Sequence, residues 1–234
     1  IVGIDDYKVV EKEDKIGYTI YIRMELLTSI NQYFKNQEIQ EKEVVKLGVD
    51  LCKALECCEK LGIMHRDIKP ENIFISKFGE YKLGDFGIAR KLENTSSIMS
   101  KKGTYLYMAP EVYKGGKYGK TVDMYSLGLV MYKLCNQNRN VFLPEPPAKI
   151  TYTDKENALS KRMEGAKFPR PTTMSSRLFS IVEKMCAYDS KKRYSSASEA
   201  KQALESLLNS GMYDKAAEAL EEKTVGVFAR TAKE

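Results

Sequence analysis

The sequence lacks tryptophan, contains a single histidine, and has no two cysteines separated by two residues. We therefore expect no metal site built from histidine and cysteine. No apolar run approaches the ~20 residues that cross a bilayer, and no signal peptide is visible. Cysteines without such a pattern are typical of reduced thiols in or near a core, and we expect a cytoplasmic protein or the cytoplasmic portion of a longer one. The cysteines are Cys52, Cys57, Cys58, Cys135 and Cys186.

Charge of both signs is present, with 38 lysines and arginines against 32 acidic residues and a formal net charge of +6. The basic residues are scattered, and only Lys101-Lys102 and Lys191-Lys192-Arg193 form tight groups. A nucleic-acid-binding protein usually concentrates them on one face, so we expect a solvated surface and no nucleic-acid partner. A chain of 234 residues that is 43% hydrophobic can bury a sizeable core in one or two domains.

Hydrophobic periodicity predicts the main elements. Alternating apolar residues indicate strands over 4–10 and 18–26, joined as a hairpin through a charged run that ends at Gly17. Apolar spacings of three and four predict a helix over 38–61, stopped by Gly62, with its polar face toward solvent. Further predictions are a helix or turn over 29–36, strands over 73–75 and 81–83, a buried helix over 122–135, and helices over 155–164, 177–187, 196–209 and 214–223.

A polar stretch, His65-Arg66-Asp67-Ile68-Lys69-Pro70-Glu71-Asn72, lies between two apolar runs and is therefore expected to be a loop with anchored ends. Lys82-Leu83-Gly84-Asp85-Phe86-Gly87 and Met108-Ala109-Pro110-Glu111 follow it. A single such motif would be unremarkable, but three in this order are specific. In these motifs the sequence resembles the protein kinase family, and in particular its serine/threonine branch, over about residues 1–209.

The resemblance implies an α+β, protein-kinase-like fold. Its C-terminal lobe would be mainly helical, and a short remnant of the antiparallel sheet of the N-terminal lobe would precede it. The implied division is a remnant of the N-terminal lobe over 1–24, a hinge over 25–28, the C-terminal lobe over 29–209, and a tail over 210–234.

The resemblance also implies catalytic roles. Asp67 would orient the attacking hydroxyl, Lys69 would lie near the transferred phosphate, and Thr104 would contact both and help to select a hydroxyl substrate. Asn72 and Asp85 would bind Mg²⁺, a hard ion that takes oxygen ligands. ATP would be the phosphate donor, and a protein with a serine or threonine acceptor would be the substrate.

The nucleotide would be bound by further residues. By resemblance, Met24 lies at the back of the pocket, Glu25 and Leu27 offer backbone groups to adenine, and Phe74 forms the floor, while Lys69, Asn72 and Asp85 face the phosphates. A plain edge strand over 21–27 is the alternative for the first three. Phe74 can serve both as core and as pocket floor.

Several motif residues would have structural roles. His65 and Phe86 belong to their motifs, Asp123 would hold the catalytic loop from beneath, and Glu111 would form a buried ion pair with Arg193. Arg66 and Arg90 could clamp a phosphate on the loop after Phe86. A polar loop without regulation is an equal alternative. The candidate phosphorylation sites are Thr95, Ser96, Ser97 and Ser100.

Three functions are compatible with these motifs. The first is a serine/threonine protein kinase. The second is a pseudokinase or truncated kinase that acts as a binding module, against which the intact set Asp67, Asn72 and Asp85 argues. The third is a small-molecule kinase, and here Lys69-Pro70-Glu71 and Ala109-Pro110-Glu111 favour a protein substrate instead. The sequence leaves the oligomeric state, the substrate and the pathway open.

Three parts of the family's pattern do not occur in this sequence: a glycine-rich loop over the phosphates, a lysine that grips them, and a helix whose glutamate holds that lysine. The sequence also begins with Ile1-Val2-Gly3 instead of an initiator methionine. We expect it to be cut from a longer protein.

Residues 1–234 alone are predicted to fold but not to transfer phosphate. The two opening strands would leave an open edge and an uncovered apolar face. The nucleotide would meet no lid and no phosphate-gripping lysine, so positioning, the main source of rate, would be lost. Calorimetric titration with Mg²⁺-ATP should show weak affinity, and a radiolabel assay should show no transfer. Robust phosphorylation of a generic protein substrate would refute this prediction.

Overall fold

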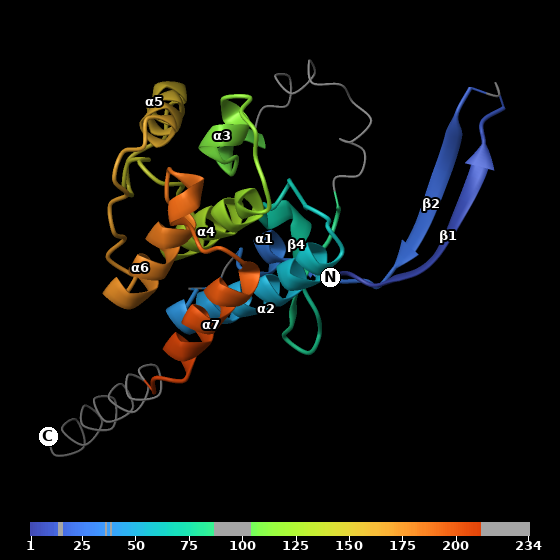
Figure 1. Ribbon diagram of the computed structural model, residues 1–234, viewed down its shortest axis with the longest axis horizontal. Coiled ribbons are helices and arrows are strands. Elements are labelled where there is room, and N and C mark those ends of the chain that lie inside the picture. The colour runs from blue at the N-terminus through green and yellow to red at the C-terminus, as the bar shows by residue number, and fades with distance from the viewer. Residues whose placement is uncertain (14–15, 36, 38, 87–103, 212–234) are drawn as a thin grey trace, which may run out of the picture.

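The computed structural model describes residues 1–13, 16–35, 37, 39–86 and 104–211 (Figure 1). Within these residues many more are helical than lie in strands, and the strands form two small antiparallel sheets. The helices are α1 (Ile30–Tyr33), α2 (Glu41–Lys60), α3 (Pro110–Tyr113), α4 (Thr121–Cys135), α5 (Tyr152–Met163), α6 (Ser176–Met185) and α7 (Ala197–Leu208), with 3₁₀ turns over Pro70–Asn72, Thr104–Leu106 and Ser190–Lys192.

Helix α4 lies at the centre of the core and is buried on nearly every side, as its apolar sequence predicted. It packs against α2 on one side and α6 on another, while α7 covers both α2 and α6. The largest fully buried side chains include Leu47 and Leu51 of α2 and Leu127 and Met131 of α4. The core therefore lies between these four helices.

Local signals set the ends of the helices. Gln40 and Glu43 form a capping box, so α2 begins at Glu41 and not at the predicted residue 38. Gly62, with φ of +65°, follows its last turn as expected. A second capping box starts α5 at residue 152 instead of the predicted 155. The Thr151 hydroxyl accepts a hydrogen bond from the amide of Asp154, and the Asp154 carboxylate accepts one from the amide of Thr151.

Ser196 and Glu199 have the spacing of a capping box at the start of α7, but only half of it forms. The Ser196 hydroxyl accepts from the amide of Glu199, as a cap should. The Glu199 carboxylate, however, accepts from the amide and hydroxyl of Ser195 and pairs with Lys184. Together these bonds lower the pKa of Glu199 to about 2.

The three-stranded sheet lies next to the candidate catalytic loop in the chain, since β4 follows that loop directly. Its strands β3 (Thr28–Ser29), β4 (Ile73–Ile75) and β5 (Tyr81–Leu83) are antiparallel, with Thr28 opposite Ile75 and Ile73 opposite Leu83. The two predicted strands over 73–75 and 81–83 are confirmed. Thr28, which ended the expected hinge, lies in a short strand that the sequence analysis missed.

The polar face of α2 is not wholly turned to solvent, which corrects the prediction. Asp50 accepts a hydrogen bond of 3.2 Å from the amide of Tyr81, so that α2 is tied to β5. Glu41 accepts from the amide and the hydroxyl of Ser175, at the start of α6. Polar residues spaced for a solvated face therefore join α2 to two other elements.

The first two strands form a hairpin that stands apart from the helices. β1 (Ile4–Glu11) pairs with β2 (Tyr18–Met24), and Figure 1 shows the pair projecting away from the helical body. Their apolar side chains are exposed on both faces: Tyr7 is 69% exposed on one face and Tyr21 60% exposed on the other. The alternation correctly predicted strands, but no other described element packs against either face.

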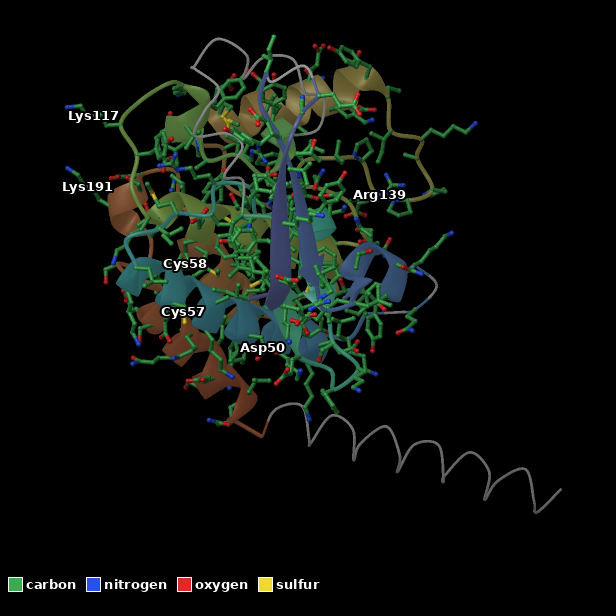
Figure 2. The ribbon with its side chains drawn as sticks, turned by 90° about the vertical axis from the view of Figure 1, so that its right-hand side faces the viewer. Asp50, Cys57, Cys58, Lys117, Arg139 and Lys191 are labelled. Carbon is green, nitrogen blue, oxygen red and sulfur yellow. The ribbon has the colours of Figure 1, made fainter. Side chains whose placement is uncertain are left out.

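All five cysteines are free thiols, as expected. Cys57 is exposed, the other four are buried, and Figure 2 shows Cys57 and Cys58 adjacent on α2, with Asp50 further along it. Burial raises the pKa of Cys52 to about 12, which keeps this thiol protonated and unreactive. None of the helices in the described ranges is long and apolar enough to span a membrane.

Replacing Gly128 with alanine should destabilise the core, because the end of α6 packs closely against Gly128 of α4. A Cβ atom there would lie 2.5 Å from the Cys186 sulfur and 3.0 Å from the Met185 Cβ. We expect a net loss of about 1–3 kcal/mol in the free energy of unfolding. Gly119→Ala is the control, since its Cβ would meet nothing within 4 Å. Equal denaturation midpoints for the two variants would contradict the packing.

Candidate active site

The polar stretch at residues 65–72 is held from below by the first turn of α4. One carboxylate oxygen of Asp123 accepts from the amide of His65 at 2.8 Å, and the other from the amide of Arg66 at 2.7 Å. Burial raises the pKa of Asp123, and the two amide donors oppose this shift. Arg66 has φ of +66°, an unfavourable conformation that these contacts stabilise. Asp123 therefore lies beneath the loop and contacts its backbone.

Three of the predicted catalytic residues meet in this loop. The Lys69 ammonium lies 2.7 Å from a carboxylate oxygen of Asp67. The Asn72 amide group donates to the Asp67 carbonyl at 2.8 Å and to the same carboxylate oxygen at 3.2 Å. The Asp67 side chain is 12% exposed and that of Lys69 is 24% exposed, so both reach solvent. A carboxylate is therefore held beside a cation at a position that a substrate can approach.

Asp85 lies beside this group, after the end of β5. The Gly84 amide donates to the Asn72 carbonyl at 3.0 Å, and the His65 ring contacts the Gly84 carbonyl at 3.0 Å. The rings of His65 and Phe86 lie 4.7 Å apart between centroids. Through these contacts the two motifs become neighbours, and Asp85 is exposed with φ of +51°.

The oxygen atoms here suit a magnesium ion in their chemistry. Asn72 uses its amide nitrogen on Asp67, which leaves its amide oxygen as an acceptor, and Asp85 adds an exposed carboxylate. Mg²⁺ is typically bound by one or two such groups together with phosphate oxygens and water. No group of three or more histidine, cysteine or acidic side chains that could hold a metal occurs in the described ranges.

The predicted nucleotide-binding residues are only partly brought together. Phe74 lies against Gly84, whose Cβ, if it had one, would meet the Phe74 ring at 2.9 Å. Glu25 pairs with Lys82 of β5 at 2.8 Å and accepts from the Gly3 amide, which together hold the pKa of Glu25 below its usual value. Met24 is half exposed at the end of β2, and Leu27 is partly buried. No motif or spacing in the sequence predicted the ion pair between Glu25 and Lys82.

Glu111 and Arg193, separated by 82 residues, form a bidentate ion pair. Their nitrogen–oxygen distances are 2.6 and 2.8 Å, and Arg193 is buried. Arg193 also donates to the carbonyls of Ala187 and Thr121 and lies over the Tyr125 ring. The pair therefore links α3 to α4 and to the segment before α7.

Other predicted residues cannot be placed in the same way. Arg90, Thr95, Ser96, Ser97 and Ser100 lie outside the described residues, as does the side chain of Thr104. The Arg66 guanidinium, expected to meet a phosphate, lies 5.6 Å from the centre of the Tyr118 ring.

The sequence analysis missed two residues that hold the segment after Thr104. The Ser126 hydroxyl of α4 donates to the Tyr107 carbonyl at 2.7 Å, and the buried Arg162 of α5 donates to the carbonyls of Tyr105 and Leu106. Arg162 stands four residues after the buried Ala158, so the helical spacing could have placed it on the inner face.

The family model described as the protein kinase domain matches residues 4–207. The chain therefore belongs to the protein kinase domain family, and its α+β architecture is that of a kinase-like fold.

Several curated proteins are similar to it. Serine/threonine-protein kinase TIO of Arabidopsis thaliana is 37% identical over 146 residues, which cover 62% of this chain and 10% of that protein. Serine/threonine-protein kinase PknB of Mycobacterium leprae is 31% identical over 202 residues, 82% of this chain and 31% of that protein. The probable serine/threonine-protein kinase PknB of Bifidobacterium longum is 33% identical over 205 residues, 85% and 29% respectively. The chain thus spans less than a third of the length of these relatives.

Replacing Glu111 with glutamine should be strongly destabilising. It would leave the Arg193 guanidinium buried without its carboxylate, a change that costs roughly 3–5 kcal/mol in comparable pairs. Arg193→Met tests the other partner. The control is Lys53→Gln, which removes the exposed ammonium from a pair with Asp50 on α2 and should cost less than about 1 kcal/mol. Thermal or denaturant unfolding measures all three, and similar losses for Glu111→Gln and the control would refute the effect of burial.

Proposed function

We propose that this chain is the catalytic part of a serine/threonine protein kinase, which transfers the γ-phosphate of ATP to serine or threonine hydroxyls of a protein. The observation that carries the proposal is the cluster of Asp67, Lys69 and Asn72, held by Asp123 beneath it. Phosphoryl transfer needs mainly positioning and charge stabilisation, and the cluster can provide both.

Each residue has a defined task in this proposal. Asp67 accepts a hydrogen bond from the substrate hydroxyl and orients its oxygen for attack. Lys69, 2.7 Å from Asp67, balances negative charge where the phosphate passes. Asn72 keeps the Asp67 carboxylate in place through its amide nitrogen. Asn72 and Asp85 would hold Mg²⁺-ATP, which supplies the phosphoryl group.

The choice of serine or threonine rests on Lys69 and on the relatives. Lys69 stands where the serine/threonine branch keeps its phosphate-contacting lysine, and the three relatives described above are named serine/threonine-protein kinases. The alternative of an inactive binding module gains no support, because Asp67, Asn72 and Asp85 are all present. Five free cysteines agree with the proposed cytoplasmic location, where thiols stay reduced.

In the longer protein, Asp67→Asn should keep nucleotide binding and lose phosphoryl transfer. Loss of a positioned base typically lowers turnover by about 10²–10⁴-fold. Asp85→Asn should weaken Mg²⁺-nucleotide binding as well. The control is Glu145→Gln, which removes an exposed carboxylate outside the candidate site. Turnover is measured by radiolabel transfer and nucleotide affinity by calorimetry.

Phosphoamino-acid analysis of the labelled product tests the substrate class in the same experiment. Label on serine or threonine is expected. Label on tyrosine alone would contradict the proposed substrate class. Wild-type turnover in Asp67→Asn would contradict the role assigned to Asp67.

A further inference from the structure

A cavity of about 150 Å³ lies between α4, α5 and α6, and none of its lining residues belongs to the candidate active site. Its walls combine aromatic rings with charged groups. The rings are those of Tyr125, Phe168 and Tyr188, and the charged side chains are Arg162, Lys167 and Glu183. A cavity with an apolar body and a few polar groups is typical of a small-molecule site.

Arg162 is the unusual member of this lining. It is only 4% exposed, and two of its nitrogens, Nη1 and Nη2, donate to the carbonyls of Leu106 and Tyr105. Its Nε is buried and makes no hydrogen bond with any described residue. A guanidinium carries five N–H donors, so most of the donor capacity of Arg162 is unused.

Arg162 also has no carboxylate partner in the described part of the chain. Arg193, which is also buried, shows the contrast, because it is paired with both oxygens of Glu111. Burial without a counter-ion disfavours the charged form and lowers the pKa of Arg162. Neutral carbonyls offset this cost less well than an anion would.

Glu183 does not act as a counter-ion for the Arg162 guanidinium. It lines the same cavity from α6 and is partly exposed, but forms no ion pair with Arg162. Lys167, exposed beside the cavity, adds a second positive charge. The formal charges of the lining side chains therefore sum to +1, which favours an anionic ligand.

We propose that this cavity binds a small organic carboxylate, whose oxygens pair with Arg162 and whose apolar body contacts the rings of Tyr125, Phe168 and Tyr188. The planar fork of a guanidinium matches the two oxygens of a carboxylate. The rings provide apolar surface that a bare inorganic anion would not use.

Occupancy of this cavity is coupled to the segment before α3. The guanidinium that pairs with the ligand also holds the carbonyls of Tyr105 and Leu106, and Ser126 holds the next carbonyl, that of Tyr107. A ligand that fixes Arg162 stabilises these contacts. Amide hydrogen exchange at residues 105–108 therefore slows when the carboxylate binds.

The experiment is a titration of the full chain with benzoate, followed by NMR and by hydrogen exchange. Benzyl alcohol, a neutral molecule of similar shape, is titrated in parallel at the same ionic strength. We expect saturable shifts with benzoate at residues 105–107 and 162–168, and none with benzyl alcohol. Arg162→Gln should weaken benzoate binding by about tenfold or more, because a charge-assisted pair is lost.

Two further variants serve as controls. Glu183→Gln removes a carboxylate that repels the ligand, and should tighten binding by about threefold or more. Lys161→Gln removes a positive charge from the exposed neighbour of Arg162 and should leave affinity unchanged. Both test the proposal even if Arg162→Gln fails to fold.

Three outcomes would overturn the proposal. Benzoate that causes no saturable shift would mean that the cavity holds water only. Equal binding of benzoate and benzyl alcohol would mean that charge plays no part. Affinity that is unchanged in both Arg162→Gln and Glu183→Gln would place the ligand elsewhere.

Discussion

The buried carboxylate of Asp123 is the contact on which the arrangement of the candidate active site depends. It stands in the first turn of α4, where the helix dipole favours negative charge, and it accepts the amides of His65 and Arg66. Without it, the amides of His65 and Arg66 would lose their acceptor, and the unfavourable φ of Arg66 would have less to stabilise it. Because Asp67 follows directly, the placement of its carboxylate depends on this anchor.

Helix α4 connects this anchor to the rest of the large helical part. Ser126, one turn beyond Asp123, holds the Tyr107 carbonyl, and Gly128 allows α6 to approach. Tyr125 lies beneath the guanidinium of Arg193 and also lines the cavity beside Arg162. Because α4 is buried on nearly every side, it contacts the candidate catalytic loop, the segment before α3 and the proposed carboxylate site at once.

Much of the fold and site could be predicted because the signals are local. Apolar spacing identified α2 and α4, and contiguous motifs identified the residues that meet around Asp67. Alternation identified β1 and β2, but it could not show that both faces would be exposed, since that depends on what packs against them. The two-residue strand β3 has no pattern of its own. It exists because Thr28 finds a partner in Ile75.

By itself, the sequence determined the protein kinase resemblance, the helices of the core and the candidate catalytic residues, because each is written in adjacent residues or in a regular spacing. Only the tertiary structure decided that Arg162 would hold the carbonyls of Tyr105 and Leu106, and that a cavity would lie beside it. Whether a buried charge meets a carboxylate or only neutral carbonyls depends on residues distant in the sequence. A local pattern reports the preference of a residue, whereas its partners are fixed by how the helices pack.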